Sequence, residues 1–428
     1  MNGERNDNTL VLILAGGVGS RLNNLVHTRA KPAVPFGGIY RIIDFSLSNV
    51  MNSGFTQAGV LTQYKPLSLM RHLGTGEAWD FTGRTRGVKI LPPRTGSSDS
   101  DWYKGTADAV RQNIDFIRAH PSRELLLLSG DHIYQMDYSE MIDFHRGKRA
   151  DVTVGMMVVD KSEIHQFGTA ITDDSNRIIE WEEKPEIPRT DLASMGIYVF
   201  STQYLLDILA REKKIIDFGK HLLPLAIESD EIFAYPFHGY WRDVGTVQAY
   251  WQANMDLLRE DSGISPQDWA VRASMEENVR GSADRPPGRF FKDSRVTNSM
   301  ISAGSVIEGE VSHSVLSPGV HVKPGARVRD SILFHDCVVK ENSLVDLAIL
   351  DKQVVVEREV VVGYGEDLTI PNKLYPKHLY TGITLVGKET VIPEKTVIGR
   401  NCMIRPGTEP RDFPSPDIPT GESIFKKY

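Results

Sequence analysis

From about Ser294 onward, aliphatic residues recur every five or six positions, and this period constrains the fold more than any other feature of the sequence. Gly, Ser, Asp and Pro fill the gaps. The repeated aliphatic positions are Ile301, Val306, Val311, Leu316, Val322, Val328, Leu333, Val339, Val345, Leu350, Val356 and Val361. An α-helix cannot bury this period. In a left-handed parallel β-helix, by contrast, each hexapeptide forms one side of a triangular coil. A stack of antiparallel strands is the alternative, but the length of the repeat favours the β-helix.

The repeat is interrupted near Gly363–Gly382 and resumes with Val386, Val391, Val397 and Met403. We therefore predict a β-helix domain over residues 294–410. Residues 411–428 are rich in Pro and charge, which predicts a loosely ordered tail.

Residues 1–260 follow a different pattern, in which strands and helices alternate. Continuous apolar runs at Leu10–Ala15 and Glu124–Leu128 are typical of parallel strands buried on both faces. Residues 106–119 carry a helical period, and Asp44 is expected to cap a helix that runs through Asn52. This alternation predicts an α/β domain with a doubly wound, mostly parallel sheet. Residues 261–293 lack periodicity and contain Pro and Gly, so we predict a linker.

Length and composition narrow the function classes. A chain of 428 residues is expected to hold two or three domains. The net charge of -7 gives no overall basic field for nucleic acid. Cys337 and Cys402 form no CxxC pair, which argues against a zinc site or a disulfide framework. The apolar runs are too short for a membrane span, and we expect a cytoplasmic protein without a membrane partner.

A glycine-rich loop, Gly16 to Arg21, follows the first predicted strand, and Lys31 lies ten residues beyond it. Glycines let backbone N–H groups approach phosphates closely, and an arginine can contact two phosphate oxygens. A turn without a chemical role is the alternative. The loop is not a dinucleotide-binding fingerprint, because Arg21 stands where a third small residue is needed. It is not a Walker loop either, since no Gly-Lys-Ser/Thr closes it.

Two aspartates are candidate metal ligands. Asp131 follows a buried strand, at the edge where open α/β sheets bind ligands, and Asp243 precedes a predicted helix. Carboxylates that face a nucleotide suit Mg²⁺. Helix capping is the alternative for both, and the neighbouring His132 is more typical of a hydrogen-bonded structural residue. The Glu182–Pro185 segment is a weak signal by itself.

Taken together, these segments resemble the nucleotide-diphospho-sugar pyrophosphorylases, and among them the bacterial glucose-1-phosphate adenylyltransferases. The resemblance covers nearly the whole chain. It is carried by the segments AGGVGSRL, RAKPAVPFGGIYRIIDFSLSN, LTQY, WYKGTADAV, SGDHIYQMDY, EEKP, ASMGIYVF, DFGKHLLP and YWRDVGT.

The resemblance implies the reaction of ATP with glucose 1-phosphate to give ADP-glucose and pyrophosphate, the committed step of glycogen synthesis, with Mg²⁺ as cofactor. It assigns the ATP phosphates to Gly16, Gly17, Arg21 and Lys31, and places Gln63 near the base. It assigns glucose 1-phosphate to Tyr103, Gly168, Glu183, Lys184 and Ser194. It assigns catalysis to Arg21, Lys31 and Asp131, and the metal to Asp131 and Asp243.

The resemblance also implies a homotetramer that is regulated by glycolytic intermediates near the junction of its domains. Gln63 and Trp102 are expected to couple the effector and substrate sites, and Arg29 is the candidate effector residue. Thr28 stands where proteobacterial relatives tend to carry a basic residue, which argues against fructose bisphosphate as the effector.

Three alternatives remain at this stage. A sister enzyme would use another base or sugar, and a silent regulatory subunit would lack the metal aspartate or the phosphate lysine. An acyltransferase would need a catalytic histidine in the β-helix, for which His313, His321 and His335 are available. That last alternative leaves the N-terminal domain unexplained.

Overall fold

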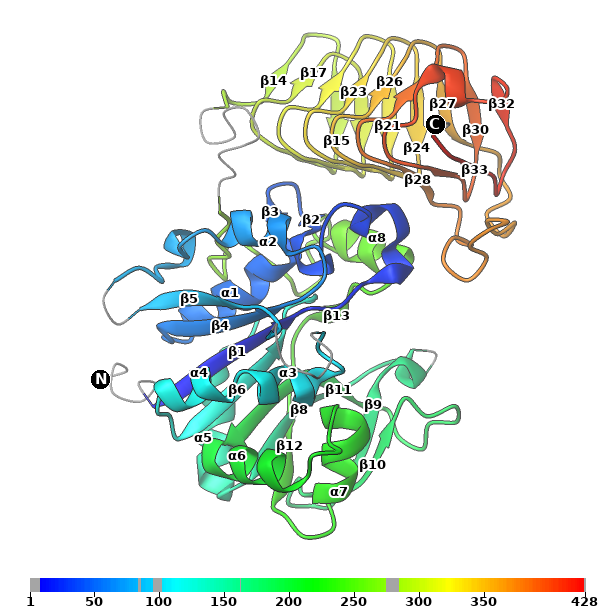
Figure 1. Ribbon diagram of the computed structural model, residues 1–428. Coiled ribbons are helices and arrows are strands. Elements are labelled where there is room, and N and C mark those ends of the chain that lie inside the picture. The colour runs from blue at the N-terminus through cyan, green and yellow to red at the C-terminus, as the bar shows by residue number, and fades with distance from the viewer. Residues whose placement is uncertain (1–7, 84–85, 95–101, 162, 275–284, 427–428) are drawn as a thin grey trace.

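A computed structural model describes residues 8–83, 86–94, 102–161, 163–274 and 285–426. It has two domains, an α/β domain and a β-helix that lies against one end of it (Figure 1). No helix in these ranges is long and apolar enough to cross a membrane.

A nine-stranded mixed sheet forms the centre of the α/β domain. Its main path runs in the order β10-β9-β11-β6-β1-β4-β5, and β8 joins β11 to β12. Strand β1 is parallel to β4 and β6, whereas β11 is antiparallel to β6 and β8. The strands are β1 (Thr9–Ala15), β4 (Gln57–Thr62), β5 (Gly87–Leu91), β6 (Glu124–Ser129), β8 (Val152–Val158), β9 (Gly168–Thr172), β10 (Ile178–Glu183), β11 (Leu192–Ser201) and β12 (Ile232–Pro236).

Helices cover both faces of this sheet, which confirms the doubly wound fold. Leu10 and Leu12 of β1 pack with α3, α4, α6 and α7, while Val11 and Ile13 pack with α1, α2 and α5. Side chains alternate across a strand, so a continuous apolar run supplies both layers. The helices are α1 (Ile42–Asn52), α2 (Pro66–Leu73), α3 (Thr106–Gln112), α4 (Ile114–Ala119), α5 (Tyr138–Lys148), α6 (Thr202–Arg211), α7 (Leu223–Ala226) and α8 (Val247–Asp256).

Two helix boundaries differ from the sequence-based expectation. Helix α1 begins at Ile42, so Asp44 lies in its first turn and accepts a hydrogen bond from the Arg41 backbone N–H (2.8 Å). The predicted helix over 106–119 is divided at Asn113, whose side-chain amide donates to the Ala109 carbonyl (2.8 Å). That bond competes with the regular helical pattern.

The C-terminal domain is a left-handed β-helix of three parallel sheets. The first sheet contains β14 (Arg289–Phe290), β17 (Val306–Ile307), β20 (His321–Val322), β23 (Val338–Val339), β26 (Val355–Val356) and β29 (Val391–Ile392). The second contains β15 (Arg295–Thr297), β18 (Glu310–Ser312), β21 (Arg327–Arg329), β24 (Leu344–Asp346), β27 (Val361–Tyr364), β30 (Val397–Gly399) and β32 (Asp417–Ile418). The third contains β16 (Met300–Ile301), β19 (Val315–Leu316), β22 (Ile332–Leu333), β25 (Ala348–Leu350), β28 (Thr384–Val386), β31 (Met403–Ile404) and β33 (Ser423–Ile424).

Both predicted ends of the β-helix need correction. Strand β14 belongs to the first coil, so the β-helix begins within the predicted linker over residues 261–293. The predicted loose tail is wrong over its described part, because β32 pairs with β30 and β33 pairs with β31. Ile418 and Ile424 are buried there. Proline and charged residues in 411–428 concealed one more aliphatic residue for two of the three sides of the coil.

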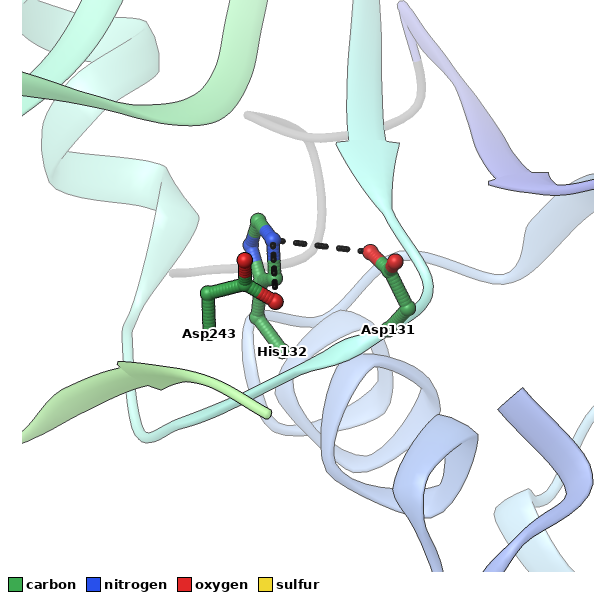
Figure 2. Close-up of side chains that lie close together, drawn as sticks. All are labelled: Asp131, His132 and Asp243. Carbon is green, nitrogen blue, oxygen red and sulfur yellow. Dashed lines mark ion pairs between the residues drawn. The ribbon is translucent and has the colours of Figure 1, made fainter. Parts of the chain in front are cut away.

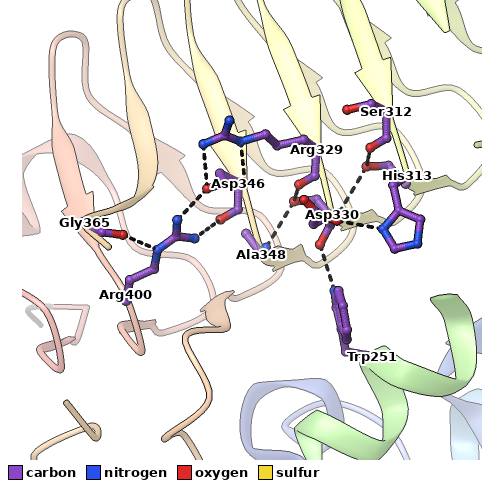
Figure 3. Close-up of polar contacts among 11 residues, drawn as sticks. Trp251, Ser312, His313, Arg329, Asp330, Asp346, Ala348, Gly365 and Arg400 are labelled. Atoms are coloured by element: carbon purple, nitrogen blue, oxygen red, sulfur yellow. Dashed lines mark hydrogen bonds and ion pairs between the residues drawn. The ribbon is translucent and has the colours of Figure 1, made fainter. Parts of the chain in front are cut away.

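The two domains share a hydrophobic core. Phe36 and Tyr250 of the α/β domain lie in one cluster with Ile332, Phe334 and Leu385 of the β-helix. Polar contacts flank this cluster: the Trp251 indole N–H on α8 donates to the Asp330 carbonyl (2.8 Å), beside a network of β-helix side chains (Figure 3). Arg29 and Asp351 form a buried ion pair across the same junction (2.9 Å).

Candidate active site

Lys31 joins the two candidate metal ligands. Its Nζ lies 2.9 Å from Asp131 Oδ2 and 2.8 Å from Asp243 Oδ1. Asp131 follows β6, and Asp243 ends β13 (Trp241–Asp243), which pairs with β7 (His132–Tyr134). One ammonium group therefore faces two carboxylates at the edge of the sheet where β1 and β6 end.

Electrostatics keep this cluster ionised. Burial by itself would lower the pKa of Lys31, but the two carboxylates outweigh burial and raise it. Burial opposes ionisation of Asp131 as well, yet the charge of Lys31, the electrostatic effect of the neighbouring His132 and the Ser129 hydrogen bond hold its pKa below the usual value. The pKa of Asp243 is lowered in the same way, mainly by Lys31 acting against burial.

Neither aspartate is a helix cap. Asp137 caps α5 by accepting from the Ser139 backbone N–H (2.9 Å), and Thr246 caps α8 by accepting from Ala249 (3.1 Å). The capping alternative for Asp131 and Asp243 is therefore excluded.

Three ligand atoms, one each from Asp131, His132 and Asp243, lie within 4.8 Å of one another (Figure 2). Two carboxylate oxygens and one imidazole nitrogen in this arrangement fit a divalent cation.

The glycine-rich loop lies beside this cluster. Arg21 Nη2 is 3.9 Å from Asp243 Oδ2, and Arg21 Nη1 is 3.4 Å from the Gln166 side-chain oxygen. Gly19 has φ of +63°, and a Cβ there would lie 2.9 Å from the Lys31 Cβ. The loop and Lys31 thus pack closely. The Arg21 side chain is 48% exposed, so its guanidinium is accessible to an anion.

Glu183 lies in a close-fitting backbone pocket. A Cβ on Gly168 would come within 2.8 Å of its carboxylate, and one on Gly219 within 2.3 Å. Burial and the nearby Asp217 raise the pKa of Glu183, whereas Lys184 and Lys220 lower it. Burial is the largest of these effects. A half-buried acceptor enclosed by glycine backbone suits a polyol ligand.

The remaining predicted substrate residues lie on neighbouring elements. Lys184 follows Glu183 in the left-handed region (φ +51°) and is exposed. The Ser194 hydroxyl on β11 accepts from the Gly196 N–H (3.2 Å). Gln63 follows β4 and contacts the Tyr103 backbone, to which its amide donates (3.5 Å). Gly16 lies against Gln63, whereas Gly17 has open space where a side chain would be.

Two of the three predicted regulatory residues, Trp102 and Arg29, lie in different surroundings. The Trp102 side chain is 57% exposed. Arg29 is buried and lines a cavity of about 1480 Å³ between the domains, where it pairs with Asp351.

Sequence reasoning missed several features of the two sites. It did not predict that Lys31 lies between two carboxylates or that His132 points toward them. It also did not identify Asp217 and Gly219 as neighbours of Glu183. The cavity also contains cations that the sequence analysis did not single out, namely Arg41, Arg71, Arg285, Lys352 and Lys388. The segment DFGKHLLP was the available signal for Asp217 and Gly219. The cavity cations come from segments too distant in sequence to be grouped beforehand.

The α/β domain places the chain in the nucleotidyl transferase family, which matches residues 10–260. A second family, described as GlmU-like C-terminal hexapeptide, matches residues 286–386.

The chain is also similar to proteins named glucose-1-phosphate adenylyltransferase. The one from Thermomicrobium roseum is 47% identical over 97% of both chains. Those from Acetivibrio thermocellus and Thermotoga maritima are 43% and 42% identical and match at least 97% of each chain. The chain belongs to this branch of the nucleotidyltransferases and is an enzyme.

Proposed function

We propose that the chain joins ATP to glucose 1-phosphate, forming ADP-glucose and releasing pyrophosphate. A phosphate oxygen of the sugar phosphate attacks the α-phosphorus, and the bond from that phosphorus to the oxygen bridging to the β-phosphorus breaks. No protein nucleophile is required, because the attacking oxygen is already anionic at neutral pH. The observation that carries the proposal is the cluster of Lys31, Asp131 and Asp243 at the sheet edge beside the glycine-rich loop.

In this proposal Lys31 and Arg21 bind and orient the triphosphate. Both are cations next to the loop whose open backbone at Gly17 suits phosphate oxygens. Glu183 binds sugar hydroxyls in its glycine pocket, and the adjacent Lys184 binds the sugar phosphate. Holding two polyanions in line removes much of the entropic barrier to reaction.

Asp131 and Asp243 would hold Mg²⁺. The ion, when bound, supplies charge stabilisation to the reacting phosphates. The two aspartates would hold the ion next to Lys31. The positive charge of Lys31 reduces the repulsion between the two carboxylates.

Substrate choice tests the proposal. Purified chain with Mg²⁺ and glucose 1-phosphate is given ATP, UTP or dTTP in turn, and pyrophosphate release is measured. We expect the highest kcat/KM with ATP and no release after chelation of the metal. Equal or better turnover with UTP would move the chain to a sister activity.

We also propose that the interdomain cavity binds an anionic effector. Arg29, Arg41, Lys352 and Lys388 converge on it. Burial and the charge of Arg29 lower the pKa of Arg41 to about 9, against the effect of Asp44. Burial and the neighbouring arginines also lower the pKa of Lys352. An anion would relieve this repulsion between cations.

Kinetics with phosphate and a panel of phosphorylated sugars test the effector proposal. We expect a saturable change in KM or kcat that Arg71→Ala weakens, because Arg71 lines the cavity and is exposed. A kinetic response that is unchanged in Arg71→Ala, or no response to any of these anions, would contradict it.

We also propose that the chain forms a homotetramer. Sedimentation of the full chain, which measures the mass of the assembly, tests this proposal. The nucleotidyl transferase match over residues 10–260 favours nucleotidyl transfer over the acyltransferase alternative.

A further inference from the structure

His132 lies among the acidic groups of the active site without a role in the mechanism above. Its Nε2 is 3.5 Å from Asp131 Oδ1 and 3.8 Å from Asp243 Oδ1 (Figure 2). These are ion-pair contacts, and no hydrogen bond joins the His132 ring to either aspartate. The side chain is only 12% exposed, so its orientation is set by protein contacts.

The other ring nitrogen determines the tautomer. His132 Nδ1 lies 3.1 Å from the Met195 carbonyl oxygen. A carbonyl oxygen can only accept, so Nδ1 carries the hydrogen and donates it. In the neutral ring, Nε2 then has a lone pair directed toward two carboxylate oxygens. No hydrogen bond joins these three electron-pair donors to one another, although Asp131 Oδ1 accepts from the Ser129 hydroxyl and Asp243 Oδ1 from Lys31. Three such donors facing one another form the inner surface of a cation site.

The backbone and an aromatic ring hold this orientation. His132 and Asp243 are direct partners in the antiparallel pairing of β7 with β13. The Trp241 ring packs edge-on against the imidazole, with centroids 5.1 Å apart at 78°. A histidine whose second nitrogen donates to a backbone carbonyl is the usual arrangement of a metal-binding imidazole.

We infer that His132 Nε2 is the third protein ligand of the divalent cation, beside Asp131 and Asp243. The inference rests on the proposed cation-binding role of the two aspartates. Ligands of one octahedral ion at about 2.1 Å lie about 3 Å apart when adjacent and about 4 Å apart when opposite. The separations of 3.5 and 3.8 Å exceed the adjacent-ligand distance, so the side chains would draw together when the ion binds.

Lys31 does not compete for the same oxygen of Asp131. Its ammonium group contacts Oδ2, whereas His132 faces Oδ1. The cation and Lys31 can therefore share Asp131 from opposite sides. At Asp243 both Lys31 and His132 face Oδ1, so that oxygen is shared between the ammonium group and the cation.

The ligand set has a consequence for metal preference. Mg²⁺ and Ca²⁺ prefer oxygen, whereas imidazole nitrogen suits transition metals better. The site should therefore bind Mn²⁺ more tightly than Mg²⁺, and His132 should carry much of that difference. A histidine that only braces Asp131 would leave the ratio of the two affinities unchanged when replaced.

Pulsed electron paramagnetic resonance of bound Mn²⁺ tests the ligand directly. Pyrophosphate is added as the only other ligand, because it contains no nitrogen. We expect a nitrogen coupling typical of a directly bound imidazole, which changes from ¹⁴N to ¹⁵N when only histidine is isotopically labelled. Bound Mn²⁺ without this coupling, or a coupling that histidine labelling does not change, would overturn the inference. This measurement uses the unaltered chain and needs no variant to fold.

Two variants provide the matched comparison. In His132→Asn the coupling should disappear and the Mn²⁺ affinity should fall on the order of tenfold or more, with a smaller loss for Mg²⁺. His238→Asn, at an exposed position of the same domain, should retain both. A coupling that persists in His132→Asn would refute the assignment. If ADP-glucose synthesis fails in the wild type, the proposed function fails, whatever the coupling shows.

Discussion

At the scale of single residues, one lysine determines the charge balance of the active site. Lys31 pairs with the carboxylates of Asp131 and Asp243. The pKa of Lys31 is raised and the pKa values of both aspartates are lowered, so all three groups favour their charged forms. The lowered pKa of Asp131 stabilises the fold above its unfolded-state pKa, and this contribution is lost only as pH falls through the folded value. The raised pKa of Lys31 gives stability that is lost only as pH rises above 10.5. The cluster therefore stays charged through the neutral range.

Asp131→Asn separates a metal ligand from a structural residue. The amide keeps the size of the side chain but lacks the charge that a divalent cation requires. We expect kcat to fall on the order of 10², equivalent to about 2.7 kcal/mol, with a smaller change in KM. The control is Asp137→Ala, which removes a true helix cap and should cost roughly 0.5–2 kcal/mol of stability with kcat intact. A kcat near the wild-type value in Asp131→Asn would contradict the assignment.

Glu183 should give the protein a measurable pH dependence of stability. Burial raises the pKa of Glu183 above 4.5. Asp217 adds to this increase, whereas Lys184 and Lys220 oppose it. The folded chain then holds the proton more tightly than the unfolded chain, so the free energy of unfolding falls as pH rises from 4.5 through the folded-state pKa.

Glu183→Gln should lack this loss of stability. Urea denaturation from acidic to neutral pH should show the variant gaining on the wild type above pH 4.5 and not below it. The exposed Glu186→Gln serves as the control. A difference between Glu183→Gln and the wild type that is constant with pH would disprove the raised pKa.

At the scale of elements, the segment before Lys31 connects the two domains. Arg29 pairs with Asp351, and the side chains are 5% and 1% exposed. Among the described residues, Nη1 of Arg29 has no hydrogen-bond partner. The Asp351 carboxylate therefore satisfies only part of the hydrogen-bonding groups of the Arg29 guanidinium. Because Lys31 lies two residues away, the β-helix and the active site meet through one short segment.

Asp351→Asn should destabilise the protein strongly, because it leaves Arg29 buried without its counter-charge. We expect a loss of about 3–5 kcal/mol in the free energy of unfolding. The double variant Arg29→Met with Asp351→Leu removes both charges and should lose less. Chemical denaturation of the two variants checks this, and an equal loss in both would argue against a charge effect.

At the scale of the whole molecule, we expect the two domains to fold as one unit because they share buried apolar surface. Phe334 of the β-helix is buried and packs edge-on against Tyr250 of α8, with centroids 6.5 Å apart. Such a contact couples the unfolding of one domain to that of the other.

Phe334→Ala should therefore lower a single thermal transition. The cavity should cost about 3–5 kcal/mol, and calorimetry should still show one peak at a lower Tm. The exposed Phe290→Ala provides a comparison on the first coil of the β-helix. Two separated peaks in the wild type would show that the domains unfold independently.

Local patterns were sufficient to predict the fold class. Both the strand–helix alternation and the aliphatic repeat depend on near neighbours in the sequence, so their periods were visible directly. The boundaries were less certain where competing side chains act, as at Asn113 and in the segment that holds Ile418 and Ile424.

The tertiary structure alone decided how the charged groups meet. The sequence separates Lys31 from Asp131 by 100 positions and from Asp243 by 212, so no local pattern could show one ammonium between two carboxylates. The direction of the His132 lone pair depends on the Met195 carbonyl of another strand. Sequence periodicity reports which faces are buried, whereas the chemistry of the site depends on long-range contacts that form only when the sheet is assembled.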